Sequence, residues 1–247
     1  MGMKIKKLMA VSILFLCLFS VRAEAFSVGA GGDFEYSPYR NESYNFYPLP
    51  IIKYDSDYLY INTPYAGVHI IRKDGFELNA QAEYTTLSFK ADKHKSNMSL
   101  LEDRDAAVTT GVESVIWGKY GLVKLNLSSD VMGNSGLRGK VSYGGVKEVG
   151  THFMLLPSAG CIWYSQKHNR YFFGVSEEES YKTGFSSFSP QASFVPFISL
   201  AAMLPVNERV SFTIMTEYRM LLSEIKDSPI VDKNKGITFY INFTYKL

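Results

Sequence analysis

The sequence predicts a transmembrane antiparallel β-barrel of about twelve strands, all-β in class and preceded by a cleaved N-terminal signal peptide. Apolar and polar residues alternate over long segments, and several of these are about twice as long as the 5–6 residues usual for a strand. Alternation with a period of two gives a strand one apolar and one polar face. A bilayer requires tilted strands of roughly 9–11 residues and leaves no backbone group unpaired, so the strands must close into a barrel.

The chain begins with a predicted export signal. Lys4, Lys6 and Lys7 precede an apolar stretch over 8–21, and Ala23-Glu24-Ala25 provides a small-residue cleavage site. The stretch is shorter than the roughly 20 residues that a spanning helix needs. We therefore expect a signal peptide over residues 1–25 and an outer-membrane barrel over residues 26–247.

Cleavage changes the charge and the cysteine count. The full chain has a net charge of +2, and the mature part keeps 22 Lys+Arg against 23 Asp+Glu. Nothing in this balance points to nucleic acid. Cys161 remains alone, which excludes an internal disulfide, and its place beside Ala159 and Trp163 suggests a small buried apolar residue.

The alternation assigns a face to each side chain. In the segment 76–89, Phe76, Leu78 and Ala80 share one side, while Glu77 and Glu83 lie on the other. The same division recurs in the segments 122–128, 210–219 and 237–247, with Met215 as an exception. The charges predicted to face the lumen are Glu77, Glu83, Lys124, Glu217, Arg219 and Lys246. We expect them to pair across the barrel and fill it, with a narrow solute pore as the functional alternative.

The order of short and long connections predicts the topology. Outer-membrane barrels keep short turns in the periplasm and longer loops outside, and the longer polar connections here lie at 37–45, 90–105, 166–189 and 223–235. Pro64 supports a tight external turn at 63–65. The expected strands are 26–36, 46–54, 57–62, 66–71, 76–89, 106–117, 121–131, 137–147, 151–165, 190–204, 208–222 and 236–247. Ten strands remain an alternative, because two of these are short.

Five short motifs follow one another along the mature chain: FSVGAGG at 26–32, YPLP at 47–50, DGF at 74–76, YFFGVS at 171–176 and DSPIV at 227–231. In their order and spacing they resemble the MipA/OmpV family of outer-membrane proteins. This resemblance implies a barrel in the outer membrane of a Gram-negative bacterium. It also implies a scaffold that joins a lytic transglycosylase to a murein polymerase. The chain departs from the family at Thr63-Pro64-Tyr65 and in ending with Leu247 rather than an aromatic residue.

No catalytic, cofactor or metal site is expected. The four histidines lack metal-ligand spacing, and no Gly-x-Ser-x-Gly motif occurs. A lipid-modifying enzyme is therefore the least favoured function, behind an adhesin or a narrow channel. The run Gly29-Ala30-Gly31-Gly32 lacks the lysine of a phosphate loop, and close backbone approach explains it better.

Two family segments are candidate interaction sites. They comprise Tyr171, Phe173, Gly174 and Ser176 in the first, and Asp227, Ser228 and Pro229 in the second. The predicted topology places both outside the cell, away from murein, which would suit an adhesin or a loop folded into the lumen. The expected partners are outer-membrane lipid, a lytic transglycosylase and a murein polymerase.

Overall fold

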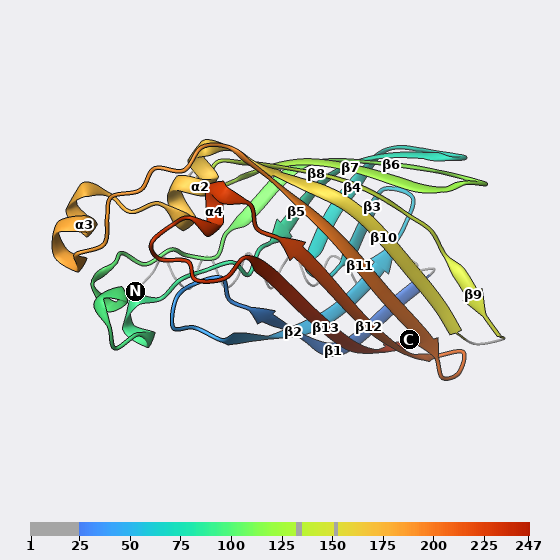
Figure 1. The fold of residues 1–247 in the computed structure, drawn as a ribbon. Coiled ribbons are helices and arrows are strands. Elements are labelled where there is room, and N and C mark those ends of the chain that lie inside the picture. The colour runs from blue at the N-terminus through green and yellow to red at the C-terminus, as the bar shows by residue number, and fades with distance from the viewer. Residues whose placement is uncertain (1–24, 132–134, 151–152) are drawn as a thin grey trace, which may run out of the picture.

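Residues 25–131, 135–150 and 153–247 are described by the computed structural model, and they form one closed antiparallel barrel (Figure 1). Residues 1–24, almost all of the predicted signal peptide, lie outside these ranges. Nearly every strand pairs with its neighbours in the sequence, and the first and last strands, β1 (Ala25–Tyr36) and β13 (Lys235–Lys246), pair from Ser27 opposite Lys246 to Tyr36 opposite Ile237. The barrel therefore closes between its two terminal strands.

The strands agree closely with the predicted ones. Their bounds are β1 Ala25–Tyr36, β2 Tyr44–Asp55, β3 Leu59–Asn62, β4 Tyr65–Lys73, β5 Phe76–Tyr84, β6 Val108–Gly118, β7 Gly121–Asp130, β8 Leu137–Gly144, β9 Lys147–Val149, β10 Phe153–Tyr164, β11 Ser193–Pro205, β12 Val210–Met220 and β13 Lys235–Lys246. Because β8 and β9 both pair with β10, β9 continues β8 after an interruption. In the described ranges the wall thus has the twelve strands that the sequence predicts.

The apolar face of each strand points outward. In β13, Phe239, Ile241 and Phe243 are exposed, whereas Asn242 and Thr244, at alternate positions of the strand, are each 3% exposed. This is the reverse of a soluble protein, where the apolar face would be the buried one, and it is the arrangement of a barrel in lipid. Among the described residues, no helix has the length and apolar character needed to cross a bilayer.

Aromatic side chains gather on the outer surface near both ends of the wall. Towards the end where β1 finishes, the rings of Phe34 and Phe46 lie 4.6 Å apart, and those of Tyr36 and Tyr44 lie 5.2 Å apart. Near the opposite end, Phe212 and Phe243 are 5.2 Å apart. Such rings suit the two membrane–water interfaces, so the band between them marks the hydrocarbon layer.

The long connections fold together into a cap over one end of the barrel (Figure 1). The cap contains α2 (Gln166–Phe173), α3 (Glu177–Thr183), α4 (Ser223–Lys226) and the 3₁₀ turns η2 (Ala91–Lys93) and η3 (Asn97–Leu100). Its buried core continues into the adjoining end of the barrel, which we call the upper end. This core includes Tyr39, Phe89, Met98, Phe172, Phe173, Ile225 and Ile230. The predicted strand 76–89 therefore ends early, at Tyr84, because residues from Thr85 onward enter the cap.

The hairpin of β3 and β4 is shorter than its neighbours. The sequence places an external turn at 63–65, and the structure does turn there, through the cis Thr63–Pro64 peptide. The turn lies partway up the wall, however, because β3 pairs with β2 only from Lys53 to Asp55. The predicted external position is therefore wrong, and β2 continues well above this hairpin.

Two sequence expectations about small residues have different outcomes. A Cβ on Gly29 would overlap the carbonyl oxygen of Phe243 in β13, so close backbone approach does explain the glycine run. Cys161 is only half-buried and not fully buried as expected. Cys161 lies opposite Pro196 of β11 and Val141 of β8 in the strand register. It points outward with them, because the odd-numbered residues of β10 face the membrane.

Candidate functional site

Ion pairs cross the upper lumen between strands that are not neighbours. Arg138 of β8 donates to Glu83 of β5 over 2.8 Å, and Lys140 of β8 lies 3.1 Å from Glu217 of β12. Arg219 of β12 lies 3.1 Å from Glu35 of β1 and 3.4 Å from Glu217. These contacts connect β5, β8, β12 and β1 through the inside of the barrel.

The pairs are largely removed from solvent. The side chains of Glu83, Glu217 and Glu35 are 11%, 13% and 9% exposed. Removing one partner of a buried pair leaves an uncompensated charge and costs about 3–5 kcal/mol. The network therefore crosslinks the strands through the lumen.

A second polar cluster lies nearer the end of the barrel at which β1 begins and β13 ends. Arg72 of β4 lies 2.7 Å from Asp55 of β2 and 2.8 Å from Glu77 of β5. His69 contacts Asp55 through Nε2 at 3.0 Å and Asn79 through Nδ1 at 2.8 Å. Both ring nitrogens of His69 are thus occupied, and neither is left to activate a serine.

The other two charges predicted for the lumen sit at less enclosed positions. Lys124 lies on the inner face of β7, opposite Ser142 of β8 in the strand register, and is exposed. Lys246 lies opposite Ser27 of β1 at the open end of the barrel and is also exposed. Neither side chain forms an ion pair among the residues that the structure describes.

In the cap, the segment Tyr171–Gly174 has four successive backbone carbonyls held by side chains from other loops. Arg104 donates to the carbonyls of Tyr171 at 3.0 Å and Gly174 at 3.1 Å. The hydroxyl of Tyr39 donates to the Phe172 carbonyl over 3.0 Å, and that of Ser228 donates to the Phe173 carbonyl over 2.6 Å. The last carbonyls of a helix lack partners within it, and here the other cap loops supply them to α2.

Arg104 also forms a buried ion pair with Glu179 of α3. Arg104 Nη2 lies 2.8 Å from Glu179 Oε1, and the two side chains are 5% and 7% exposed. Burial alone would raise the pKa of Glu179. The backbone N–H groups of Ser176 and Glu102, together with the Arg104 guanidinium, outweigh burial and hold that pKa below its usual range.

The two candidate interaction segments meet each other inside this cap. Ser228 contacts Phe173 directly, and both are nearly inaccessible, at 2% and 3% exposure. Gly174 is also buried, and Tyr171 and Pro229 are half-buried. Ser176, which caps α3 by accepting from Glu179 N–H, and Asp227 are the exposed members. Sequence reasoning missed Arg104 and Tyr39, because they come from distant loops and carry no local motif.

The two histidines of the cap, His94 and His168, pack against aromatic rings. His168 stacks on Tyr164 with ring centroids 4.2 Å apart, and its Nδ1 lies 3.0 Å from the Ser135 carbonyl. Burial, aided by the Arg138 charge, lowers the pKa of His168 to about 3, so its ring is neutral at physiological pH. His94 stacks on Phe89 at 4.9 Å. In the described part of the chain, no group of three or more His, Cys, Asp or Glu side chains could hold a metal ion.

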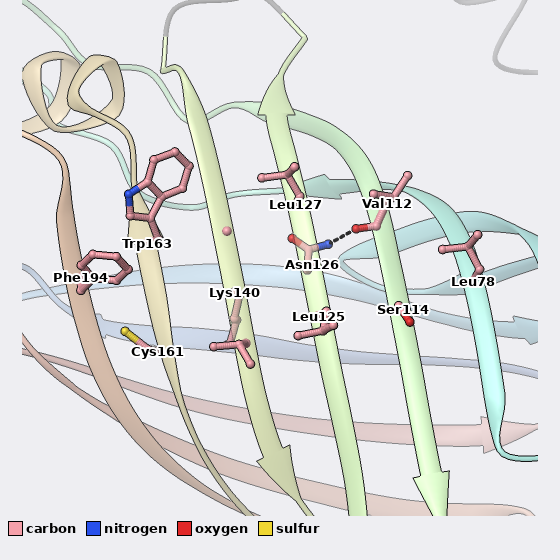
Figure 2. A pocket seen from close by; sticks show the side chains of 12 residues that line it. Leu78, Val112, Ser114, Leu125, Asn126, Leu127, Lys140, Cys161, Trp163 and Phe194 are labelled. Carbon is pink, nitrogen blue, oxygen red and sulfur yellow. Dashed lines mark hydrogen bonds between the residues drawn. The ribbon is translucent and has the colours of Figure 1, made fainter.

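The outer wall carries an apolar groove of about 350 Å³ across β5–β8, β10 and β11 (Figure 2). Gly139 leaves a gap in the row of side chains, and Trp163 and Phe194 stand at one end of the groove, with Leu78 at the other. Because it opens on the membrane-facing surface, the groove belongs to the lipid contact of the barrel.

Comparison with known proteins identifies relatives over the whole barrel. The Escherichia coli K12 protein named outer membrane protein YiaT is 32% identical over 229 residues, covering 92% of this chain and 93% of that protein. The MltA-interacting protein of the same strain is 29% identical over 244 residues, covering 97% and 98%. OmpV of Vibrio cholerae is 29% identical over 133 residues, covering 53% and 51%.

A solved outer membrane channel from Pseudomonas putida F1 is similar over 92% of this chain and 97% of that chain, with a TM-score of 0.45 and 8% identity. The family model described as MltA-interacting protein MipA matches residues 28–247, which is the entire barrel apart from the first residues of β1. Its relatives are outer-membrane proteins by name, and this chain is accordingly a protein of the outer membrane. The chain belongs to the MipA family of MltA-interacting proteins.

Proposed function

We propose that this barrel is a non-enzymatic scaffold that binds a lytic transglycosylase and connects it to a murein polymerase. The observation that carries the proposal is the crosslinked interior. Ion pairs such as Arg138–Glu83 and Lys140–Glu217 cross the lumen, and the cap lies over its outer end. A barrel built in this way offers surfaces to partners rather than a passage to solutes. A relative of nearly the same length is named MltA-interacting protein, which supports the choice of partner.

The binding surface that we propose is a periplasmic lip, formed by residues 116–122 of the β6–β7 hairpin and residues 143–149 of β8 and β9. These two segments extend furthest at the end of the barrel opposite the helices (Figure 1). Other turns at that end are short, such as residues 56–58 and 74–75. Murein enzymes act in the periplasm, so their contact must lie at this end.

The composition of the lip suits a protein contact. Tyr120 is 79% exposed, Val146 65%, Tyr143 57% and Val149 42%. Aromatic side chains such as those of Tyr120 and Tyr143 are enriched at the centres of protein interfaces, and the two valines add apolar area beside them. Lys147 and Glu148 lie beside them and supply a polar rim. A standard interface uses roughly 20–30 residues a side, so the lip would combine with the neighbouring rim of the barrel.

The test is direct binding of a purified MltA-type lytic transglycosylase to the barrel in mild detergent. The double variant Tyr120→Glu, Val146→Glu places two charges in the proposed contact and is expected to weaken binding at least tenfold. Tyr181→Glu provides the control, because Tyr181 is 93% exposed but lies on α3 in the cap at the other end. Its binding should match that of the unmodified barrel.

Two results would overturn the proposal. The first is that the unmodified barrel binds neither the transglycosylase nor a murein polymerase. The second is that Tyr181→Glu reduces binding while the lip variant does not, which would place the contact on the outer surface of the cell. Each variant is first checked for folding by its heat-dependent mobility in SDS gels.

A further inference from the structure

The upper part of β2 forms an unpaired edge within the barrel wall. Below it, Thr63 N–H donates to the Ile52 carbonyl over 3.1 Å, and Ile52 N–H donates to Thr63 Oγ1 over 3.1 Å. The polar backbone groups of Ile52 therefore point towards β3. Because these groups alternate in direction along a strand, those of Tyr44, Phe46, Pro48 and Pro50 point the same way. In the described structure, no hydrogen bond meets them on that side.

The segment that follows β5 lies opposite this unpaired edge, on the inner side of the barrel wall. Above Tyr84, residues Thr85–Phe89 pass towards the lumen and join the cap. Thr86 donates to Glu35 over 3.2 Å, and the hydroxyls of Tyr47 and Ser88 are 3.3 Å apart. Both contacts lie on the inner side of β1 and β2. The edge of β2, the turn at Thr63–Pro64 and the segment 85–89 thus border a stretch of wall that no strand pairing closes, which we call the lateral slot.

The two prolines decide what kind of partner suits this edge. Pro48 and Pro50 have no N–H group, and both fall on the positions whose backbone faces the slot. A strand added to the edge would need those donors, and proline is a usual means of preventing such addition. At these two positions only the carbonyls remain, which accept hydrogen bonds but cannot complete a ladder.

The surroundings of the slot are apolar on both sides of the wall. Phe46 is 55% exposed on the outer face, where Pro48 and Pro50 are also exposed. On the inner face, Leu49 and Ile51 replace the polar residues found on other strands, and Leu87 packs nearby against the cap core. The slot lies between the aromatic rings of Phe34 and Phe46 and the middle of the wall, so it opens into the outer leaflet.

We propose that the lateral slot binds an acyl chain of an outer-leaflet lipid, which passes the edge of β2 and contacts Leu49 on the inside. A hydroxyl or amide group near the head of such a lipid would donate to the free carbonyls of Phe46, Pro48 or Pro50. This site is independent of the scaffold function, because it lies at the opposite half of the barrel from the periplasmic lip.

The test measures whether lipid reaches an inward residue behind the slot. The full barrel is reconstituted into liposomes whose lipids carry brominated acyl chains, which quench tryptophan on contact. Trp117→Phe and Trp163→Phe remove both native tryptophans, and Leu49→Trp introduces the probe. Met215→Trp is the matched control, since Met215 is also inward-facing, apolar and half-buried but is paired on both sides by β11 and β13. Leu200→Trp reports full lipid exposure.

The expected result is that Leu49→Trp is quenched as strongly as Leu200→Trp and several-fold more than Met215→Trp. Quenching at Leu49 no greater than that at Met215 would overturn the proposal. If Leu49→Trp fails to fold, a nitroxide on Leu49→Cys, with Cys161→Ser, gives the same information through collisions with oxygen and a nickel chelate. A photoreactive residue at Phe46 that crosslinks in cells to a protein instead of a lipid would likewise contradict it.

Discussion

Single side chains hold the cap together, and Arg104 has the largest part. It meets two carbonyls at the end of α2 and the carboxylate of Glu179 on α3. A planar guanidinium presents several N–H groups in a fixed fork that reaches acceptors on separate loops, a geometry that the compact ammonium group of lysine lacks. The family motif at 171–176 is thus, in this structure, the place where the cap loops are fastened to one another.

Replacing Arg104 should loosen the cap while leaving the barrel intact. Arg104→Ala leaves Glu179 buried without its partner and is expected to lower the free energy of cap opening by about 3–5 kcal/mol. Hydrogen exchange of the amides over 166–183 measures this. Lys182→Ala is the control on the same helix, because its pair with Glu178 is 50% and 71% exposed and should contribute little. Equal effects of the two variants would refute the role of Arg104.

The cap should also weaken on acidification because of His168. Its pKa falls from 6.5 to about 3 in the folded cap, so between these values the open form binds a proton that the closed form does not. Stability of the closed cap is therefore full above about pH 6.5 and declines as the pH falls, by at most about 1.4 kcal/mol per unit from this group.

Hydrogen exchange over 166–173 at pH 7 and pH 5 tests the sign and the residue. His168→Gln retains a donor for the Ser135 carbonyl but does not titrate in this range. The variant should show a smaller loss of protection between the two pH values than the unmodified protein. An unchanged pH dependence would show that another group is responsible.

The sequence predicts inner and outer residues well but not the contacts between distant loops. A period of two is enough to place Glu83 and Glu217 on the inner face, because any strand with one lipid-facing side must show it. It does not reveal that Glu83 meets Arg138 and Glu217 meets Lys140, since these distances depend on the stagger of the strands around the barrel.

At the scale of elements, the barrel depends on the junction of its first and last strands. Gly29 lies in β1, and a Cβ at this position would overlap the backbone of Phe243 in β13. Gly118 at the end of β6 has no neighbouring atom within 4 Å of such a Cβ. The two glycines therefore form a matched pair for testing the closure of the wall.

Gly29→Ala is expected to destabilise this junction by about 1–3 kcal/mol, the usual cost of inserting a methyl group where no space exists. The folded band in unboiled SDS gels should melt at a lower temperature than that of the unmodified barrel. Gly118→Ala should leave the melting temperature unchanged. If both substitutions were harmless, the tight approach of β1 and β13 would be contradicted.

The elements that sequence reasoning placed wrongly are those shaped by the cap and the short hairpin. Alternation continues from Phe76 to Phe89, but the strand ends at Tyr84 because Leu87 and Phe89 are used as core residues of the cap. Pro64 predicts the turn because proline has no N–H group to donate to a neighbouring strand. The position of the turn along the wall depends instead on the length of β3, which has only 4 residues.

At the scale of the whole molecule, three features act together. The outer wall is apolar, ion pairs cross the upper lumen, and the cap covers the outer end (Figure 1). This arrangement supports the proposed scaffold function, because a crosslinked barrel is a rigid platform whose contacts lie on its rim. The acyl-chain site in the wall requires no open passage either.

Conductance across a planar bilayer tests the filled lumen most directly. The account predicts that the unmodified barrel, once inserted, gives no discrete current steps, while the double variant Arg138→Ala, Arg219→Ala, which removes two of the crossing cations, gives brief and unstable ones. Steady, discrete steps from the unmodified barrel would contradict the account, because they would show that ions pass where the crosslinked interior should exclude them.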